Sequence, residues 1–268
     1  MIRFVHIFNY AEGMSANDGE EWYLGKHVPG VRELPGVKKY VSWQASEQHP
    51  GSRNPEMFKR YVRRSEVFFE TLAEGLKATL GNPDLWTPST EGEPGFRELE
   101  CMFLEEEPQY DFLRDVPIQQ YKYMGNPLNF SGGEPEWVDD DDFLYWVYFF
   151  NYRTDISIAD GKEWVVDGED WYLGQHVREG KIMKQLGKRH YKTWRALRVP
   201  SEPVNPLLLG RWYRLTELGV PQGIRYWGNE KAVPDMTAPA EGEMVGEGGY
   251  GELRHIIINP ELAQDLLE

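Results

Sequence analysis

The feature that most constrains this chain is an internal repeat. Residues 19–28 read GEEWYLGKHV and residues 168–177 read GEDWYLGQHV, so eight of the ten positions are identical. The similarity continues upstream in the same order, where residues 4–10 match residues 146–152. A repeat of about 150 residues is too long for a solenoid unit and indicates a duplicated domain.

The hydrophobic pattern of the first copy predicts the order β-α-β-β-α-β. Pro29 removes one backbone donor, so the first helix is expected to kink or loosen just after His27. Ser65, followed by Glu66, is interpreted as the N-cap of the second helix, which Gly81 ends. The predicted elements are a strand at 2–10, a helix at 20–34, strands at 37–45 and 57–64, a helix at 65–80 and a strand at 96–105.

The second copy is predicted to begin at Phe143 and to follow the same order. It has Arg178 where the first copy has Pro29, so we expect its first helix to run straighter. Residues 217–249 are rich in proline and glycine, which favours a loop over a second helix. The third strand is expected at 212–216 and the fourth at 252–258. The predicted domains are 1–107 for the first repeat, 108–142 for a connector with an acidic end, and 143–268 for the second repeat.

The duplication indicates how the two repeats could pack. A four-stranded sheet with helices on one face needs a cover for its other face. Two repeats can supply it by placing their open faces together in a barrel-like core. The predicted fold class is therefore α+β, with two ferredoxin-like βαββαβ repeats whose antiparallel sheets face each other. Alternate residues of a strand share a side, so the expected barrel-facing residues are Phe4, His6, Phe8, Tyr10, Trp146, Tyr148, Phe150 and Tyr152.

Composition and charge exclude several classes of protein. A formal net charge of −15 would repel nucleic acid and anionic lipid, so neither is an expected partner. The single cysteine, Cys101, allows no disulfide within the chain and suits a reducing, cytoplasmic compartment. The longest apolar run, residues 143–150, is too short to cross a bilayer as a helix.

The repeated segment and its flanks resemble a known family. The sequences WYLGKHVPG at 22–30 and LPGV at 34–37, together with Tyr40, are similar to the EthD-like group of the dimeric α/β-barrel superfamily. The second copy, at 171–176, keeps the tryptophan, tyrosine, leucine, glycine and histidine but is followed by no Pro-Gly. The resemblance implies the fold of a dimeric α/β barrel. It implies function only broadly, because that superfamily includes cofactor-free monooxygenases, cyclases, isomerases, dehydratases and haem enzymes.

Tyrosine–histidine pairs are the leading candidates for chemistry. Tyr23 and His27 are four residues apart on the predicted helix and share a face, as do Tyr172 and His176. An imidazole can transfer protons near neutral pH, and a phenol can hold an oxyanion. His6, on the presumed inner side of the first strand, is the third catalytic candidate of the first copy. The alternative is that His27 and His176 bond backbone carbonyls and only support folding.

Other side chains are predicted to line a binding site for a small hydrophobic or aromatic molecule. They are Tyr40, Tyr61, Tyr148, Tyr172, His176 and His255. Their alternative role is core packing, which is the commoner one for aromatic residues on strands. The residues expected to face solvent are His49, His190, Arg60, Arg63 and Arg64. The alternative for the three arginines is that they clamp a carboxylate.

The sequence contains no metal-ligand spacing, phosphate-binding glycine loop or nucleophile elbow. No cofactor is therefore expected, and a haem held by one axial histidine is the alternative. The leading hypothesis is a cofactor-independent lyase, a dehydratase or decarboxylase, acting on a small aromatic or cyclic, polyketide-like or aromatic-catabolite-like substrate. The alternatives are a cofactor-free monooxygenase and a non-catalytic protein that binds a hydrophobic molecule. A homodimer of the fused pair is compatible with the sequence, because an edge strand could pair across a two-fold axis.

Overall fold

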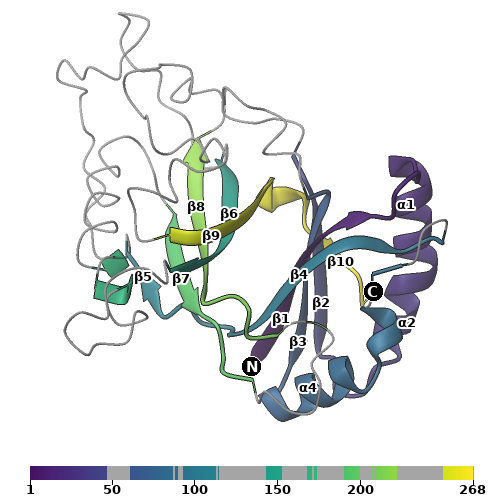
Figure 1. Cartoon of the computed structure of the whole chain (residues 1–268), viewed down its shortest axis with the longest axis horizontal. Coiled ribbons are helices and arrows are strands. Elements are labelled where there is room, and N and C mark those ends of the chain that lie inside the picture. Colours follow the sequence, from purple (N-terminus) through teal and green to yellow (C-terminus); the bar gives the residue numbers. More distant parts are fainter. Residues whose placement is uncertain are drawn as a thin grey trace, which may run out of the picture.

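The structure is a computed structural model, and the described part of the chain comprises residues 1–46, 61–86, 88–89, 93–112, 114, 143–152, 168–170, 172–173, 190–199, 207, 209–221 and 250–267. Within these residues the chain is an α+β protein with two antiparallel five-stranded sheets and few helices (Figure 1). The α+β class expected from the sequence is confirmed.

The first sheet has the strand order β10-β2-β3-β1-β4. Its central strand β1 pairs with β3 on one side and β4 on the other, both antiparallel. The helices lie between the strands in the order expected for a β-α-β-β-α-β unit. The bounds of the strands are β1 (Ile2–Tyr10), β2 (Lys39–Gln44), β3 (Arg63–Phe69), β4 (Phe96–Glu105) and β10 (Gln264–Asp265).

Helices cover one face of this sheet, and the second sheet lies on its other side (Figure 1). The first helix begins after Ser15, whose side chain accepts a hydrogen bond from the backbone N–H of Asp18. It continues through a π-helical turn into a short second α-helical segment. The helical elements are α1 (Ala16–Trp22), η1 (Tyr23–His27), α2 (Val28–Arg32), α4 (Leu72–Leu80) and the 3₁₀ turn η2 (Pro83–Leu85).

The first helix loosens at a different place from the one predicted. The loosening expected after His27 lies before it, in η1, where the N–H of Val28 donates to the Tyr23 carbonyl five residues earlier. Residues 172–173 also form a π-helical turn in the second copy. That copy lacks the counterpart of Pro29, so the proline alone does not cause the turn. The straighter second helix was expected around Arg178, which lies outside the described residues, so it stays a prediction.

The boundary between the third strand and the second helix lies later than predicted. β3 contains Ser65 and runs to Phe69. The helix N-cap is Thr71, which forms a reciprocal capping box with Glu74. Ser65 and Glu66 imitate a cap because they are polar and precede an apolar run. Both are buried on the strand and bonded to other side chains, which local sequence does not reveal.

The second sheet repeats the first, with the order β5-β7-β8-β6-β9. Both central strands shift register near their ends, between Asn9 and Tyr10 in β1 and between Asn151 and Tyr152 in β6. The third strand, expected at 212–216, reaches residue 221. The elements are β5 (Tyr110–Asp111), β6 (Phe143–Tyr152), β7 (Tyr191–Arg195), β8 (Arg214–Pro221), β9 (Tyr250–Ile258) and the 3₁₀ turn η6 (Pro260–Leu262).

Each half of the chain adds a short strand to the sheet of the other half. β5 follows β4 and pairs with β7, whereas β10 follows β9 and pairs with β2. The flanking backbone bonds correspond, because Leu266 donates to the Tyr40 carbonyl and Phe112 donates to the Tyr191 carbonyl. Two-residue strands carry no hydrophobic period, so the sequence did not predict this exchange.

The two faces of β1 are exchanged relative to the prediction. The face expected to line the barrel meets the helices, and the other face meets the second sheet. Phe4 and Phe8 belong to a core cluster that includes residues of α2 and α4, on the helix-covered face. Val5 and Ile7, on the other face, belong to a second cluster with residues of β6, β8 and β9. The expected barrel-facing set of aromatic residues is therefore wrong. Aliphatic side chains of β1, together with aromatic ones such as Phe149, Trp194 and Trp212, fill the layer between the sheets instead.

The same exchange of faces holds for β6. Val147 and Phe149 point into the layer between the sheets, so the alternate residues, including Trp146, Tyr148, Phe150 and Tyr152, point away from it. A strand that is buried on both faces reads as a continuous apolar run. The alternation could therefore not show which face meets the helices.

Candidate functional site

The three catalytic candidates of the first half lie together in the core beneath the helices. His6 projects from the middle of β1 and His27 from the end of η1, and their ring centroids are 6.4 Å apart. Their exposed fractions are 0% and 2%. The ring of Tyr23 stacks on His27 with a centroid distance of 5.2 Å.

Aromatic side chains enclose the two imidazoles. Trp86 meets both rings edge-on, at 5.3 Å from His6 and 5.2 Å from His27. Phe96 lies 4.8 Å from His27 by the same measure. The sequence did not identify Trp86 or Phe96 as a site residue. Trp86 follows the second helix and lies outside the repeated motif. The group is named here the imidazole box and consists of Phe4, His6, Phe8, Trp22, Tyr23, His27, Trp86 and Phe96.

The ring nitrogens of the box are incompletely paired. His27 forms a hydrogen bond with the backbone of Leu85, and this bond raises its pKa. The ring therefore donates an N–H, and the carbonyl accepts it. The Nε2 atom of His27 and both ring nitrogens of His6 have no hydrogen-bond partner among the described residues. Since buried polar atoms are normally bonded, three such nitrogens in one place require an explanation.

Burial makes both imidazoles weak bases. Desolvation lowers the pKa of His27 to about 3, although its bond with Leu85 acts in the opposite direction. Desolvation also lowers the pKa of His6 well below 6.5, and the proximity of His27 adds to the shift. Both rings are neutral at pH 7 and carry one donor and one acceptor nitrogen each.

The hydroxyl of Tyr23 contacts strands β2 and β3. It lies 2.7 Å from the Tyr40 hydroxyl and 2.7 Å from Ser65 Oγ. The guanidinium of Arg63 lies over the Tyr23 ring, 4.6 Å from its centroid, and donates to Ser42 Oγ at 2.8 Å. Burial raises the pKa of both phenols, which keeps them protonated. Tyr40, a predicted binding residue, is thus part of this hydroxyl cluster.

A carboxylate completes the cluster. Glu20 binds the guanidinium of Arg63 and accepts a hydrogen bond from the Tyr10 hydroxyl. Gln264, in the edge strand contributed by the other half, accepts a further bond from Arg63 at 2.9 Å. Desolvation alone would raise the pKa of Glu20, but the bonds from Arg63 and Tyr10 lower it overall. The prediction that Arg63 faces solvent is wrong, because this set of partners holds it fully buried.

The second half contains the same cluster. Glu169 binds Arg214, with Nε and Oε1 2.6 Å apart, and accepts a bond from Tyr152. Arg214 lies 5.4 Å from the centroid of Tyr172. Gln109, contributed by the first half, accepts a bond from Arg214 at 2.8 Å. Tyr172, predicted to bind substrate, therefore occupies the position of Tyr23.

A glycine shared by the two motifs makes room for this cluster in each half. A Cβ atom on Gly19 would lie 2.2 Å from the ring of Tyr10, and one on Gly168 would lie 2.2 Å from the ring of Tyr152. Three residue types that the two motifs share, Gly, Glu and Tyr, thus have one structural purpose. They seat a tyrosine and a carboxylate against a buried arginine.

The two halves differ at the position of His6 on β1. Tyr148 stands in place of His6, and His255 stands in place of Cys101. Each pair consists of register partners on neighbouring strands, so the histidine changes strands between the halves. His176, the counterpart of His27, lies outside the described residues, and its role stays a prediction.

Tyr61 lies away from the box. It belongs to the cluster between the sheets, and its hydroxyl is 3.5 Å from Glu100 Oε1. Glu100 also accepts a bond from Trp212 Nε1 at 3.0 Å and is bound by Arg211. Because this cluster lies on the opposite face of the first sheet from His6, Tyr61 does not join the catalytic candidates.

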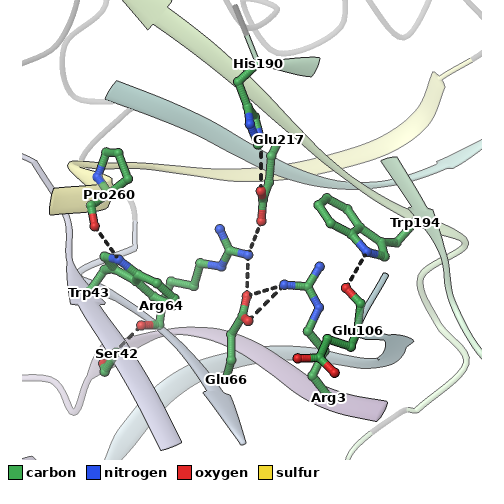
Figure 2. A network of polar contacts seen from close by, with 10 residues as sticks. All are labelled: Arg3, Ser42, Trp43, Arg64, Glu66, Glu106, His190, Trp194, Glu217 and Pro260. Atoms are coloured by element: carbon green, nitrogen blue, oxygen red, sulfur yellow. Dashed lines mark hydrogen bonds and ion pairs between the residues drawn. The ribbon is translucent and has the colours of Figure 1, made fainter. Parts of the chain in front are cut away.

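A buried ionic network connects the two sheets (Figure 2). Arg3 donates to both oxygens of Glu66 at 2.9 Å, and Arg64 binds Glu66 and Glu217. His190 Nε2 lies 3.1 Å from Glu217 Oε2. Desolvation alone would raise the pKa of Glu217, but Arg64 and the bond with His190 lower it overall. The expectation that Arg64 and His190 face solvent is wrong, since both pair with carboxylates between the sheets.

The remaining observations concern metal sites, membrane spans, the single cysteine and two residues that were expected to face solvent. Among the described residues, no three His, Cys, Asp or Glu side chains are grouped as a metal site. No helix in the described part of the chain is long and apolar enough to span a membrane. The thiol of Cys101 is buried, which raises its pKa, and it donates to the Leu207 carbonyl at 3.4 Å. His49 and Arg60 lie outside the described residues.

No family model matches this chain, and no curated protein matches it. Among solved structures, a presumed monooxygenase from Lactobacillus acidophilus NCFM is similar, with 9% identity over 96% of this chain and 92% of that one, and a TM-score of 0.33. A mutant chlorite dismutase from Candidatus Nitrospira defluvii is similar, with 8% identity over 97% of this chain and 92% of that one, and a TM-score of 0.35. At such scores neither likeness supports an argument about fold or activity.

Proposed function

We propose that this chain is a cofactor-independent lyase, a dehydratase or decarboxylase, whose active site is the imidazole box of its first half. We also propose that its two halves form an intramolecular counterpart of an EthD-like dimeric α/β barrel. Three features support the second proposal. They are the hydrophobic layer between the sheets, the exchanged edge strands and the duplicated arginine–carboxylate cluster.

The observation that carries the catalytic proposal is the set of unpartnered imidazole nitrogens on His6 and His27. Leaving a buried donor or acceptor unsatisfied costs about 1–3 kcal/mol. A chain that only needed to fill this core could use apolar side chains. Two neutral imidazoles side by side can instead accept and donate protons to a bound molecule.

In this proposal His27 acts as the base. Its bond with Leu85 uses the Nδ1–H, so Nε2 holds the lone pair. Nε2 takes a proton from the carbon beside a substrate carbonyl, and an N–H of His6 bonds the resulting enolate oxygen. The enolate expels a β-hydroxyl group, to which His27 returns the proton. A C–H and a C–O bond break, a C=C bond and water form, and both histidines end neutral.

The low pKa of His27 restricts the reactions that it can catalyse. A base with a pKa of about 3 needs a substrate whose C–H is unusually acidic. Elimination that completes an aromatic ring satisfies this requirement, which favours cyclic precursors of aromatic compounds. Both imidazoles are closed off from solvent, so a substrate reaches them only after neighbouring side chains move.

The alternative function is non-catalytic binding of a hydrophobic molecule. The observation that favours it is the same bond from His27 to the Leu85 carbonyl, because this contact also holds η1 to η2. On this alternative the imidazoles contribute hydrogen bonds to a ligand and no proton transfer.

The test compares the wild-type chain with His27→Asn. The amide N–H₂ of asparagine can keep the bond with Leu85, but nothing replaces Nε2. A panel of cyclic β-hydroxy ketones and β-keto acids is incubated with each protein, and loss of water or CO₂ is followed by mass spectrometry. The proposal predicts turnover that falls about 100- to 10,000-fold in His27→Asn, with unchanged thermal stability. Turnover that survives the substitution contradicts it, and binding without any turnover favours the alternative.

A further inference from the structure

The contacts of the two imidazoles are all uncharged. The described neighbours that stack on or bond either ring are Phe4, Phe8, Trp22, Tyr23, Leu85, Trp86 and Phe96. Among these neighbours, no side chain carries a formal charge. The box therefore offers a ligand hydrogen bonds and aromatic surface, without an ionic partner.

The arginine beside the box cannot act as that partner. Arg63 lies over the Tyr23 ring, and its guanidinium is bound to Glu20, Ser42 and Gln264. The positive charge is thus neutralised by a carboxylate. Moving the guanidinium toward a ligand would leave the partly buried Glu20 without its counter-ion, which is costly.

On the neighbouring strand β4, the thiol of Cys101 is a further uncharged group of this core. It is the register partner of His6 and is bonded to the Leu207 carbonyl. Its burial raises its pKa and keeps it protonated. Among the described residues, no titratable group next to His6 therefore supplies a charge at pH 7.

We infer that the imidazole box takes an uncharged aromatic molecule bearing a hydroxyl or ketone oxygen, and that it rejects carboxylates. This inference rests on the proposed function and selects dehydration over decarboxylation within it. A neutral oxygen can accept from a ring N–H and, where it carries a hydrogen, donate to Nε2 of His27. These contacts satisfy one nitrogen of His6 and Nε2 of His27 without adding charge.

A carboxylate in the same place would be unfavourable for two reasons. As an anion it would be buried without a cation, which costs several kcal/mol. The other route is protonation of an imidazole, which desolvation opposes for both rings. Both routes disfavour the anion relative to a neutral molecule of the same shape.

The test is calorimetric titration of the full chain at pH 7 with 2-naphthol, 2-naphthoate and naphthalene, and with the smaller pair phenol and benzoate. We expect the hydroxyl compound of at least one pair to bind 100-fold or more tightly than its carboxylate. His6→Phe should weaken binding of the hydroxyl compound about 10-fold, toward that of the hydrocarbon, because an imidazole bond is lost. Arg97→Met, at an exposed position, should leave all affinities unchanged.

Each contrary result has a distinct meaning. Carboxylates that bind as tightly as the hydroxyl compounds overturn the inference, whereas the acid–base proposal survives as decarboxylation. Naphthalene that binds as tightly as 2-naphthol, with no effect of His6→Phe, shows that the nitrogens are not used and also overturns it. If none of the five probes binds, the inference fails, and the turnover measurement on the wild-type chain and His27→Asn decides the proposed function separately.

Discussion

The two halves of this chain share one buried cluster and differ in another. Both place a tyrosine, a carboxylate and an arginine under the first helix, and each receives a glutamine from the other half. Only the first half pairs a histidine on the central strand with a neutral core of aromatic rings. The shared cluster can be assigned to folding, since duplication preserved it with its geometry. The residues that differ are the better candidates for function.

The largest expected effect is a loss of turnover when β1 is changed at His6, with no such loss when β6 is changed at the matching position. His6→Tyr installs the residue that the second half has at this position. It should lower turnover of an identified substrate about 100- to 1,000-fold, because the donor for the enolate oxygen is lost. The matched change Tyr148→His should leave the rate within a factor of three. Steady-state kinetics of both variants test the comparison, and a larger loss for Tyr148→His would move the active site to the second half.

Removing the arginine should damage both halves alike. Arg63→Met and Arg214→Met each leave a partly buried carboxylate without its partner, which costs about 3 kcal/mol of unfolding free energy, the low end for a buried ion pair. Urea unfolding followed by circular dichroism measures this loss, with the exposed Arg97→Met as the control. If only one of the two variants is destabilised, the cluster is not a common folding device.

The glycines of the repeated motif should also respond alike. Gly19→Ala and Gly168→Ala would each place a Cβ atom against a tyrosine ring and cost about 1–3 kcal/mol. Gly25→Ala is the control within the same motif, because its Cβ atom would have no neighbour within 4 Å. It should be neutral or stabilising by about 1 kcal/mol. Thermal unfolding that ranks Gly25→Ala below Gly19→Ala would contradict this account.

The smallest effect is a slope of stability with pH. The folded-state pKa of His6 and His27 lies below the unfolded value of about 6.5. The unfolded state therefore binds more protons below pH 6.5, and stability falls as the pH falls. Each histidine contributes a slope that rises from about 0.7 kcal/mol per pH unit at pH 6.5 to about 1.4 at pH 5. Urea unfolding between pH 6.5 and 5 should show a shallower slope for His6→Tyr, and an unchanged slope would mean that His6 titrates normally.

The sequence predicted which residues the candidate site contains better than it predicted their contacts. The repeated tyrosine and histidine led to Tyr23 and His27, and the strand alternation placed His6 on the same side as Phe4 and Phe8. It could not give the role of Glu20 or Arg63, because an arginine on a strand reads as exposed unless its buried partners are known. Trp86 was missed, since a single tryptophan after a helix carries no signal of the ring that it contacts.

By itself the sequence determined the duplication, the α+β class and the positions of most strands, because identity between copies and hydrophobic period are local properties. Only the tertiary structure decided which face of β1 meets the helices, since both faces are apolar. It also decided that each half lends an edge strand and a glutamine to the other. These features depend on contacts between residues far apart in the chain, which no local pattern records. The neutral imidazole box is such a feature, because its chemistry arises from burial among residues of four separate elements and a loop.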